Sequence, residues 1–143
     1  MKKIPKTILF EIHDSPNGKK NPQLLRVILN EEHTRIDFGY HTYPLYINGG
    51  WIKIAPETFI EEKETKKRYL LTKALNIPVS PDKLHFESQK DWQFFSLYFE
   101  PLPQINCTIN VIEDENPTRD DFNYYDIELL MQDGVRVKEA LIY

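Results

Sequence analysis

The chain has 143 residues, 41% of them hydrophobic and 28% charged, and a formal net charge of -4 at pH 7. Its length suits a single domain spanning residues 1–143, and its composition lies within the range of soluble globular proteins, outside that of disordered chains. The acidic balance argues against a general nucleic-acid binder, which would present a concentrated basic surface.

The N-terminal part of the chain predicts three strands. Residues 7–13 alternate between apolar and polar side chains, as a half-buried strand does. Segments 24–29 and 34–40 follow, and the short polar connection between them suits a tight turn.

A β-hairpin is expected at Asn48-Gly49, because both residues tolerate the positive φ angles of a two-residue turn. Its strands would be residues 43–47 and 51–54. Aromatic side chains gather near this turn, and exposed rings of this kind anchor protein interfaces or stack on sugars. The candidate binding residues are Tyr40, Tyr43, Tyr46 and Trp51.

Residues 61–75 allow two interpretations. Apolar residues between positions 70 and 75 share a helical face, and the charged residues before them are good helix formers, so a helix is one alternative. The other is a pair of strands, 59–60 and 69–71, joined by a charged tip. We favour the strands, because the remainder of the chain is predicted as strands.

Residues 92–99 carry aromatic side chains at both even and odd positions. Phe94 and Phe95, for example, fall on opposite faces of a strand. We therefore expect a central strand of a layered β protein, covered on both faces.

Further strands are expected toward the C-terminus. Residues 105–111 alternate and place Ile105 and Cys107 together on a core face. A hairpin follows, with residues 132–134 as a three-residue loop and Gly134 in the left-handed conformation, because this register matches the apolar faces of its two arms.

About eight to ten short strands separated by turns favour a sandwich over a barrel. The expected fold is all-β: a two-sheet antiparallel β-sandwich, immunoglobulin-like or a related Greek key. The single cysteine excludes an intramolecular disulfide, so an antibody-type domain is not indicated.

No catalytic or metal-binding residues and no cofactor are predicted. The histidines, at positions 13, 33, 41 and 85, lack the spacing of zinc sites, and no serine lies in a Gly-x-Ser-x-Gly context. We therefore expect that the protein is not an enzyme. A hydrolase that combines His13, His41 or His85 with an acid from another loop is the third functional hypothesis.

Residues 113–121 include five carboxylates, which could supply oxygen ligands for calcium in a loop between strands. The segment lacks the spacing of an EF-hand, and a solvated acidic connection is the alternative we favour. Calcium in this loop would suit a carbohydrate-binding module, which is the second functional hypothesis.

The leading hypothesis is a non-catalytic binding or assembly domain that contacts an unidentified protein partner. The contact would use a sheet edge, which can pair with a partner strand, or the aromatic residues around Trp51. No segment approaches the roughly 20 apolar residues of a membrane span. Without a signal peptide, the chain is expected to be cytoplasmic as written, or exported if it is a cropped piece of a longer one.

Six different short motifs follow one another along the chain. They are Thr34-Arg35-Ile36-Asp37-Phe38, Gly50-Trp51-Ile52-Lys53-Ile54, Tyr69-Leu70-Leu71, Asn76-Ile77-Pro78, Phe95-Ser96-Leu97-Tyr98-Phe99-Glu100-Pro101-Leu102 and Asn110-Val111-Ile112-Glu113. Together, over about residues 25–115, the chain resembles small β-sandwich domains of Bacteroidota whose function is largely unassigned. The resemblance implies a bacterial source and a strand at 69–71, and it implies no catalytic residues.

Overall fold

The structure is a computed structural model that describes residues 7–12, 23–41, 51–52, 54–75, 84–85, 92–113 and 123–137. For the strand residues 40, 41, 51, 52, 84, 85, 92 and 93, it describes the backbone alone.

The described residues form strands and one short 3-10 helix, and they contain no α-helix. The strands are β1 (Thr7–Glu11), β2 (Gln23–Leu29), β3 (Thr34–His41), β4 (Trp51–Ile52), β5 (Phe59–Glu62), β6 (Arg68–Leu75), β7 (Leu84–His85), β8 (Trp92–Phe99), β9 (Cys107–Ile112), β10 (Tyr124–Leu129) and β11 (Val135–Val137). The 3-10 helix, Met131–Asp133, joins β10 to β11. The all-β prediction is confirmed.

Nine of these strands form a single antiparallel sheet in the order β10-β9-β5-β6-β8-β3-β2-β1-β11, and β4 pairs with β7 separately. The sequence predicted two stacked sheets. Instead the two layers belong to one continuous sheet, because β6 pairs with β5 through its first residues and with β8 through its later ones. A register shift between Leu71 and Lys73 marks this change of partner, as expected where a bulge bends a strand.

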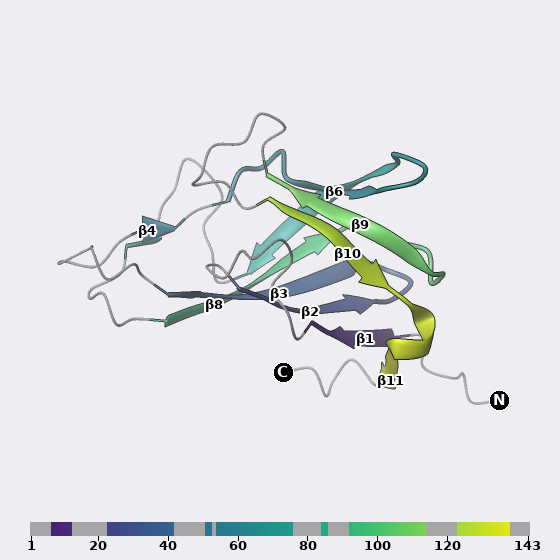
Figure 1. The fold of residues 1–143 in the computed structure, drawn as a ribbon. Coiled ribbons are helices and arrows are strands. Elements are labelled where there is room, and N and C mark those ends of the chain that lie inside the picture. Colours follow the sequence, from purple (N-terminus) through teal and green to yellow (C-terminus); the bar gives the residue numbers. More distant parts are fainter. Residues whose placement is uncertain are drawn as a thin grey trace.

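The folded sheet encloses the core between its two halves. Figure 1 shows β9 and β10 above and β1, β2 and β3 below. The rings of Phe38 on β3 and Tyr124 on β10 meet across this space, with centroids 5.5 Å apart, and Phe38 also stacks on Phe95 of β8 at 5.0 Å. The three side chains are at most 2% exposed, so they occupy the middle of the core.

The two outermost strands of the sheet order, β10 and β11, are consecutive in the chain. Residues 130–134 alone separate them, so the chain itself brings the two ends of the sheet together. The predicted hairpin between these segments is wrong: β10 pairs with β9, and β11 pairs with β1.

Gly134 lets the chain pass from β10 to β11 close against β1. It is extended, with φ -82° and ψ 148°, and not left-handed as the predicted loop required. A Cβ at this position would lie 2.4 Å from Cγ2 of Ile8, far inside van der Waals contact. The residue is therefore a glycine because the chain passes directly against β1, and not because it turns through a positive φ.

The favoured interpretation of residues 61–75 is confirmed, and the alternative helix is wrong. Strands β5 and β6 pair with Phe59 opposite Leu70 and Glu61 opposite Arg68. At the charged tip the amide of Thr65 donates to the Glu62 carboxylate at 2.6 Å, and Lys66 adopts a φ of 66°. A local side-chain bond and one left-handed residue thus turn the chain where the sequence also offered good helix formers.

The central position of the aromatic strand is also confirmed, since β8 is the middle strand of the nine. The expectation that both its faces are covered is wrong in part: Phe95 is 2% exposed, whereas Phe94 on the opposite face is 61% exposed. On β9, the next strand along the chain, Cys107 is buried as predicted, but Ile105 precedes the strand and is exposed.

The Asn48-Gly49 turn lies outside the described residues. The strand after it, β4, pairs with β7 so that Trp51 lies opposite His85. The described residues include no helix that is both long and apolar enough to span a membrane.

Candidate functional site

The structure describes little of the predicted aromatic binding group. Tyr40 lies on β3 opposite Gln93 of β8, and Trp51 lies on β4 of the separate strand pair. Only the backbone of these two residues is described, and Tyr43 and Tyr46 lie outside the described residues. The prediction of a binding surface there stays a prediction.

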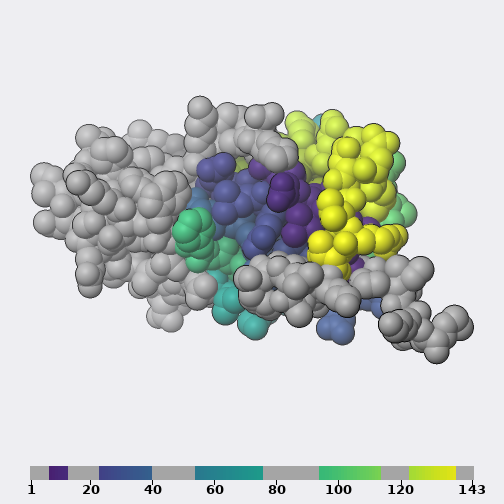
Figure 2. Space-filling model, turned by 90° about the horizontal axis from the view of Figure 1, so that it is seen from below, coloured from purple at the N-terminus to yellow at the C-terminus, as the bar shows by residue number. Residues whose placement is uncertain are grey.

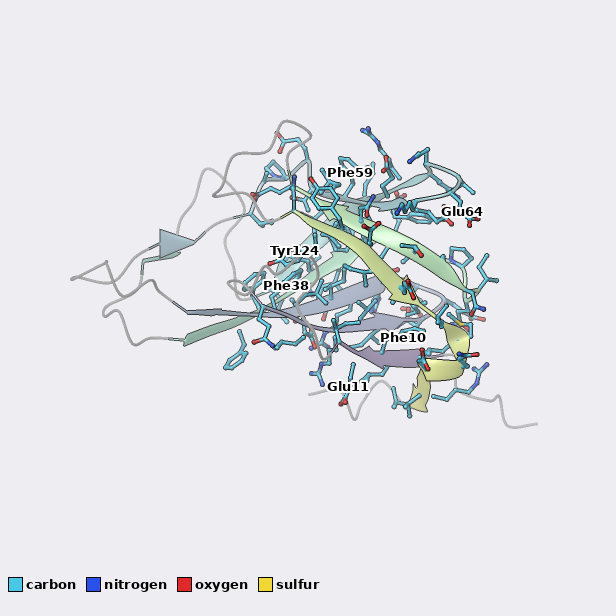
Figure 3. The ribbon with its side chains drawn as sticks, viewed as in Figure 1. Phe10, Glu11, Phe38, Phe59, Glu64 and Tyr124 are labelled. Carbon is cyan, nitrogen blue, oxygen red and sulfur yellow. The ribbon has the colours of Figure 1, made fainter. Side chains whose placement is uncertain are left out.

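A second candidate lies on the outer face of the lower half of the sheet. The pairing registers align five residues in one row across five strands: Glu11, Arg26, Asp37, Ser96 and Leu75. Since side chains alternate between the faces of a strand, all five lie opposite the core residues. In Figure 3, Glu11 accordingly lies beneath the sheet, on the side away from Phe38 and Tyr124.

Asp37 is the centre of a polar network in this row. Its Oδ1 accepts hydrogen bonds from Nε of Arg35 at 2.8 Å and from Oγ of Ser96 at 2.6 Å, and its Oδ2 accepts one from Nε of Arg26. Asp37 and Arg35 are each 6% exposed and Ser96 is 7% exposed. Burial of a carboxylate is costly unless donors surround it, and these three donors supply that compensation.

The next row continues the polar face toward β6. The guanidinium of Arg35 lies 5.8 Å from the Tyr98 ring centroid, and Nζ of Lys73 lies 5.4 Å from it. His33 meets the same ring edge-on at 5.0 Å. Cation–π contacts of this kind hold the two basic groups along the face.

Phe94 borders the network on the other side. It lies opposite Gly39 in the register of β3 and β8. A Cβ on Gly39 would lie 3.3 Å from Cε1 of Phe94 and 3.6 Å from Cδ1 of Leu25, so the ring rests against the glycine backbone. The ring is thereby fixed in place, although 61% of the residue remains exposed.

A pocket of about 470 Å³ lies on part of the outer face, between Phe94 and the network around Asp37. Its lining residues are Glu11, Ile12, Leu25, Arg26, Arg35, Asp37, Phe38, Leu75, Phe94, Phe95 and Ser96. Figure 2 shows this face from below, with β1 to β3 in purple to blue and parts of β8 and β6 beside them in green and teal. Such a pocket, lined by both apolar and charged residues, lies in the size range of ligand sites.

A second pocket, of about 770 Å³, lies where the β2–β3 turn, the start of β6 and β11 meet. Its charged residues are Glu31, Lys67 and Arg136. Nζ of Lys67 lies 5.1 Å from the ring of Tyr69, whose pKa is raised above its usual value chiefly by burial. These charges come from turns and an edge strand, whereas the outer-face pocket is built on central strands.

The described residues include no group of three or more His, Cys, Asp or Glu side chains placed to hold a metal ion. Of the predicted calcium segment, Glu113 is described, and its Oε2 accepts a hydrogen bond from the amide of Ala55 at 2.9 Å. Residues 114–122 lie outside the described part of the chain, as do His13 and the side chains of His41 and His85.

The sequence contained one signal for the outer-face pocket that the prediction did not use. Arg35, Asp37 and Gly39 alternate with the core residues Ile36 and Phe38 on a predicted strand, which the structure places next to the middle strand of the sheet. Charged residues facing away from the core on such a strand indicate a functional or a fully paired polar face. The site is completed only by pairing with β8, where Ser96 donates a hydrogen bond to Asp37. These two residues are 59 positions apart in the sequence.

The comparisons with known proteins add no relative, so the resemblance to Bacteroidota domains stays a prediction. No protein-family model, curated protein or solved structure matches this chain.

Proposed function

We propose that this chain is a non-catalytic binding domain that contacts a protein partner through the outer face around Phe94. The observation that carries this proposal is the 61% exposure of an aromatic ring on the middle strand of the sheet, held against Gly39. Fixed aromatic side chains beside arginine are the residues that most often dominate the energy of protein interfaces. Arg26 and Arg35 lie in the same pocket as Phe94.

A single exposed apolar residue is common on protein surfaces and by itself indicates nothing. A ring can also shield the backbone of a glycine on the neighbouring strand. The proposal therefore depends on three features occurring together: a ring that rests against Gly39, a pocket next to it, and the buried charged residues Arg35 and Asp37 in the lining of that pocket.

The face is a better candidate than the sheet edges. Strand β10 carries a bulge between Tyr124 and Ile127, with Asp126 at a φ of 59° and paired to Lys63. Strand β11 has three residues within the described part of the chain, which ends at Val137. Bulges, charges and short length are the features by which edge strands avoid pairing with another chain.

The test compares variants of the intact chain in affinity purification from its native cells, followed by titration with the purified partner. We expect Phe94→Ala to lower the affinity by about thirtyfold, the loss typical of an interface hot spot. Val135→Ala is the matched control, because Val135 is 59% exposed but lies on β11.

Trp51→Ala separates this face from the aromatic group predicted near the Asn48-Gly49 turn. If the partner binds Phe94→Ala as tightly as the unaltered chain and is lost from Trp51→Ala, the turn is the interface and the proposed face is wrong. Thermal unfolding of each variant shows that a lost partner does not reflect a lost fold.

A further inference from the structure

The turn between β2 and β3 is held by the side chain of Asn30, which is 7% exposed. Its Oδ1 accepts hydrogen bonds from the backbone amides of Glu32 and His33, both at 2.8 Å. A backbone amide only donates, so the atom that meets both amides is the oxygen of the Asn30 side chain. The two bonds therefore fix which way this side chain faces, and its Nδ2 is the atom directed at the His33 ring.

This orientation determines where the proton of His33 lies. Nδ2 of Asn30 is 3.3 Å from Nε2 of His33. The nitrogen of an amide side chain donates and does not accept, so a hydrogen bond between these two atoms requires an Nε2 without a proton. In this arrangement the His33 ring is neutral and has its proton on Nδ1.

Protonation of His33 is incompatible with the same contact. A proton on Nε2 would set two donors against each other, and Asn30 cannot turn over without losing both backbone amides. The ring is partly exposed, so solvent can supply the proton. Histidine is the side chain whose charge ordinarily changes between about pH 5 and 8.

The neutral ring has a second contact, with Tyr98 of β8. The two rings meet edge-on, with centroids 5.0 Å apart and an angle of 72° between their planes. A ring that leaves Asn30 also leaves this position, because both contacts depend on one placement of the imidazole. The distance between the two rings therefore reports whether the contact with Asn30 is made.

Other charged and titratable groups surround His33 on the turn and on three strands. Among the described residues they are Glu31 and Glu32 of the turn, Arg35 of β3, Lys73 of β6, Tyr98 of β8 and Glu100 directly after β8. The two cations lie 5.8 and 5.4 Å from the centroid of the Tyr98 ring, whereas the three carboxylates belong to exposed residues. These charges influence the pH at which His33 is protonated, but the contact between two donors is present whatever their balance.

We propose that Asn30 and His33 form a pH-sensitive switch in the β2–β3 turn. At neutral pH Nε2 of His33 accepts a hydrogen bond from Asn30, and the ring lies against Tyr98. When Nε2 binds a proton from solvent, the ring leaves both partners. Asn30 and Glu31 line the 770 Å³ pocket, so the turn that the switch controls is part of the wall of that pocket. The switch is separate from the proposed binding face around Phe94.

NMR spectroscopy of the intact, isotope-labelled chain tests the switch between about pH 7.5 and about pH 5. The shifts of the ring nitrogens report the tautomer, and at the higher pH we expect the proton on Nδ1 and none on Nε2. The nuclear Overhauser effect between the His33 and Tyr98 rings reports their contact. We expect the ratio of docked to released ring to fall about tenfold at the lower pH, as for the loss of one hydrogen bond.

Asn30→Asp should reverse this response. One carboxylate oxygen still accepts from the two backbone amides, and the other accepts a hydrogen bond from protonated Nε2. The ring contact should then be as strong or stronger at the lower pH, which a merely structural role of Asn30 would not produce. Glu32→Gln is the matched control, because it removes an exposed acid of the same turn and keeps the Asn30 contact. It should respond to pH as the unaltered chain does.

Three outcomes overturn the inference. A proton on Nε2 of neutral His33 in the unaltered chain would exclude the hydrogen bond from Asn30, whether or not the Asn30→Asp variant folds. A ring contact that is equally strong at both pH values would show that protonation does not release the ring. A contact that weakens as much in folded Asn30→Asp as in the unaltered chain would show that Asn30 does not control the response.

Discussion

The ring of Phe94 occupies the space that a side chain at Gly39 would need, since a Cβ there would lie 3.3 Å from Cε1 of Phe94. Gly39→Val should therefore push the ring away from β3. We expect partner affinity to fall about tenfold, because the aromatic anchor loses its fixed position. The free energy of unfolding should change by less than about 1 kcal/mol, because valine suits a strand better than glycine does.

Titration with the partner and urea denaturation check this prediction. The matched control is Thr108→Val, which places the same side chain on strand β9 in the other half of the sheet. An unchanged affinity for Gly39→Val would mean that the position of the Phe94 ring does not matter for binding.

Asp37 should be the most sensitive polar residue of the outer face. Asp37→Ala leaves the buried Arg35 without the carboxylate that its Nε contacts at 2.8 Å. We expect the free energy of unfolding to fall by about 3–5 kcal/mol, the cost typical of breaking a buried ion pair from one side. Urea denaturation measures this loss.

Lys63→Gln is the comparison, because it breaks an ion pair whose two side chains, Lys63 and Asp126, are 51% and 55% exposed. Its cost should stay below about 1 kcal/mol. Similar losses for the two variants would show that the network around Asp37 is no more stabilising than a surface pair.

The sequence predicted most strands and not their partners, for a physical reason. Alternation of apolar and polar residues depends on local chain geometry, so it located the strand of Ile36 and Phe38. Aromatic residues at odd and even positions alike located the middle strand, which contains Phe95. Pairing between distant segments depends on packing of the whole core. The same local pattern therefore could not show that Asp37 meets Ser96, nor that β11 joins β1 instead of β10.

Gly134 tests the connection between the two ends of the sheet. Gly134→Ala adds a Cβ that would lie 2.4 Å from Cγ2 of Ile8 and 3.0 Å from the Phe10 ring. We expect a loss of about 1–3 kcal/mol in the free energy of unfolding, as for other insertions into a packed site. Asp133→Ala, at an exposed neighbour that donates a backbone bond to Leu130, should cost much less.

Lys66 at the β5–β6 tip tests the left-handed turn. Its φ of 66° strains any residue with a Cβ, and a β-branched one most. Lys66→Gly should leave the chain equally stable or more stable by up to about 1 kcal/mol, whereas Lys66→Val should destabilise it by at least about 1 kcal/mol. Thermal unfolding distinguishes the two, and a Lys66→Val variant as stable as the unaltered chain would contradict the described turn.

Cys107 gives the protein a predicted loss of stability at alkaline pH. Burial raises the pKa of its thiol above the ordinary value of 9.0, and the negative charge of Glu62 raises this pKa further. The unfolded chain therefore loses the thiol proton at a lower pH than the folded chain does. Stability is fully retained below the ordinary pKa and falls as pH rises through and beyond it.

Urea denaturation at several pH values, from neutral to about one unit above the ordinary thiol pKa, measures this fall. Cys107→Ala removes the ionisable group, so its free energy of unfolding should start lower, because a core side chain is shortened, and then decline less steeply. Tyr69 also has a raised pKa, but from an ordinary value of 10.0, so its effect begins at higher pH in both proteins. Parallel curves for the two proteins would show that the thiol ionises equally easily in the folded and unfolded chains.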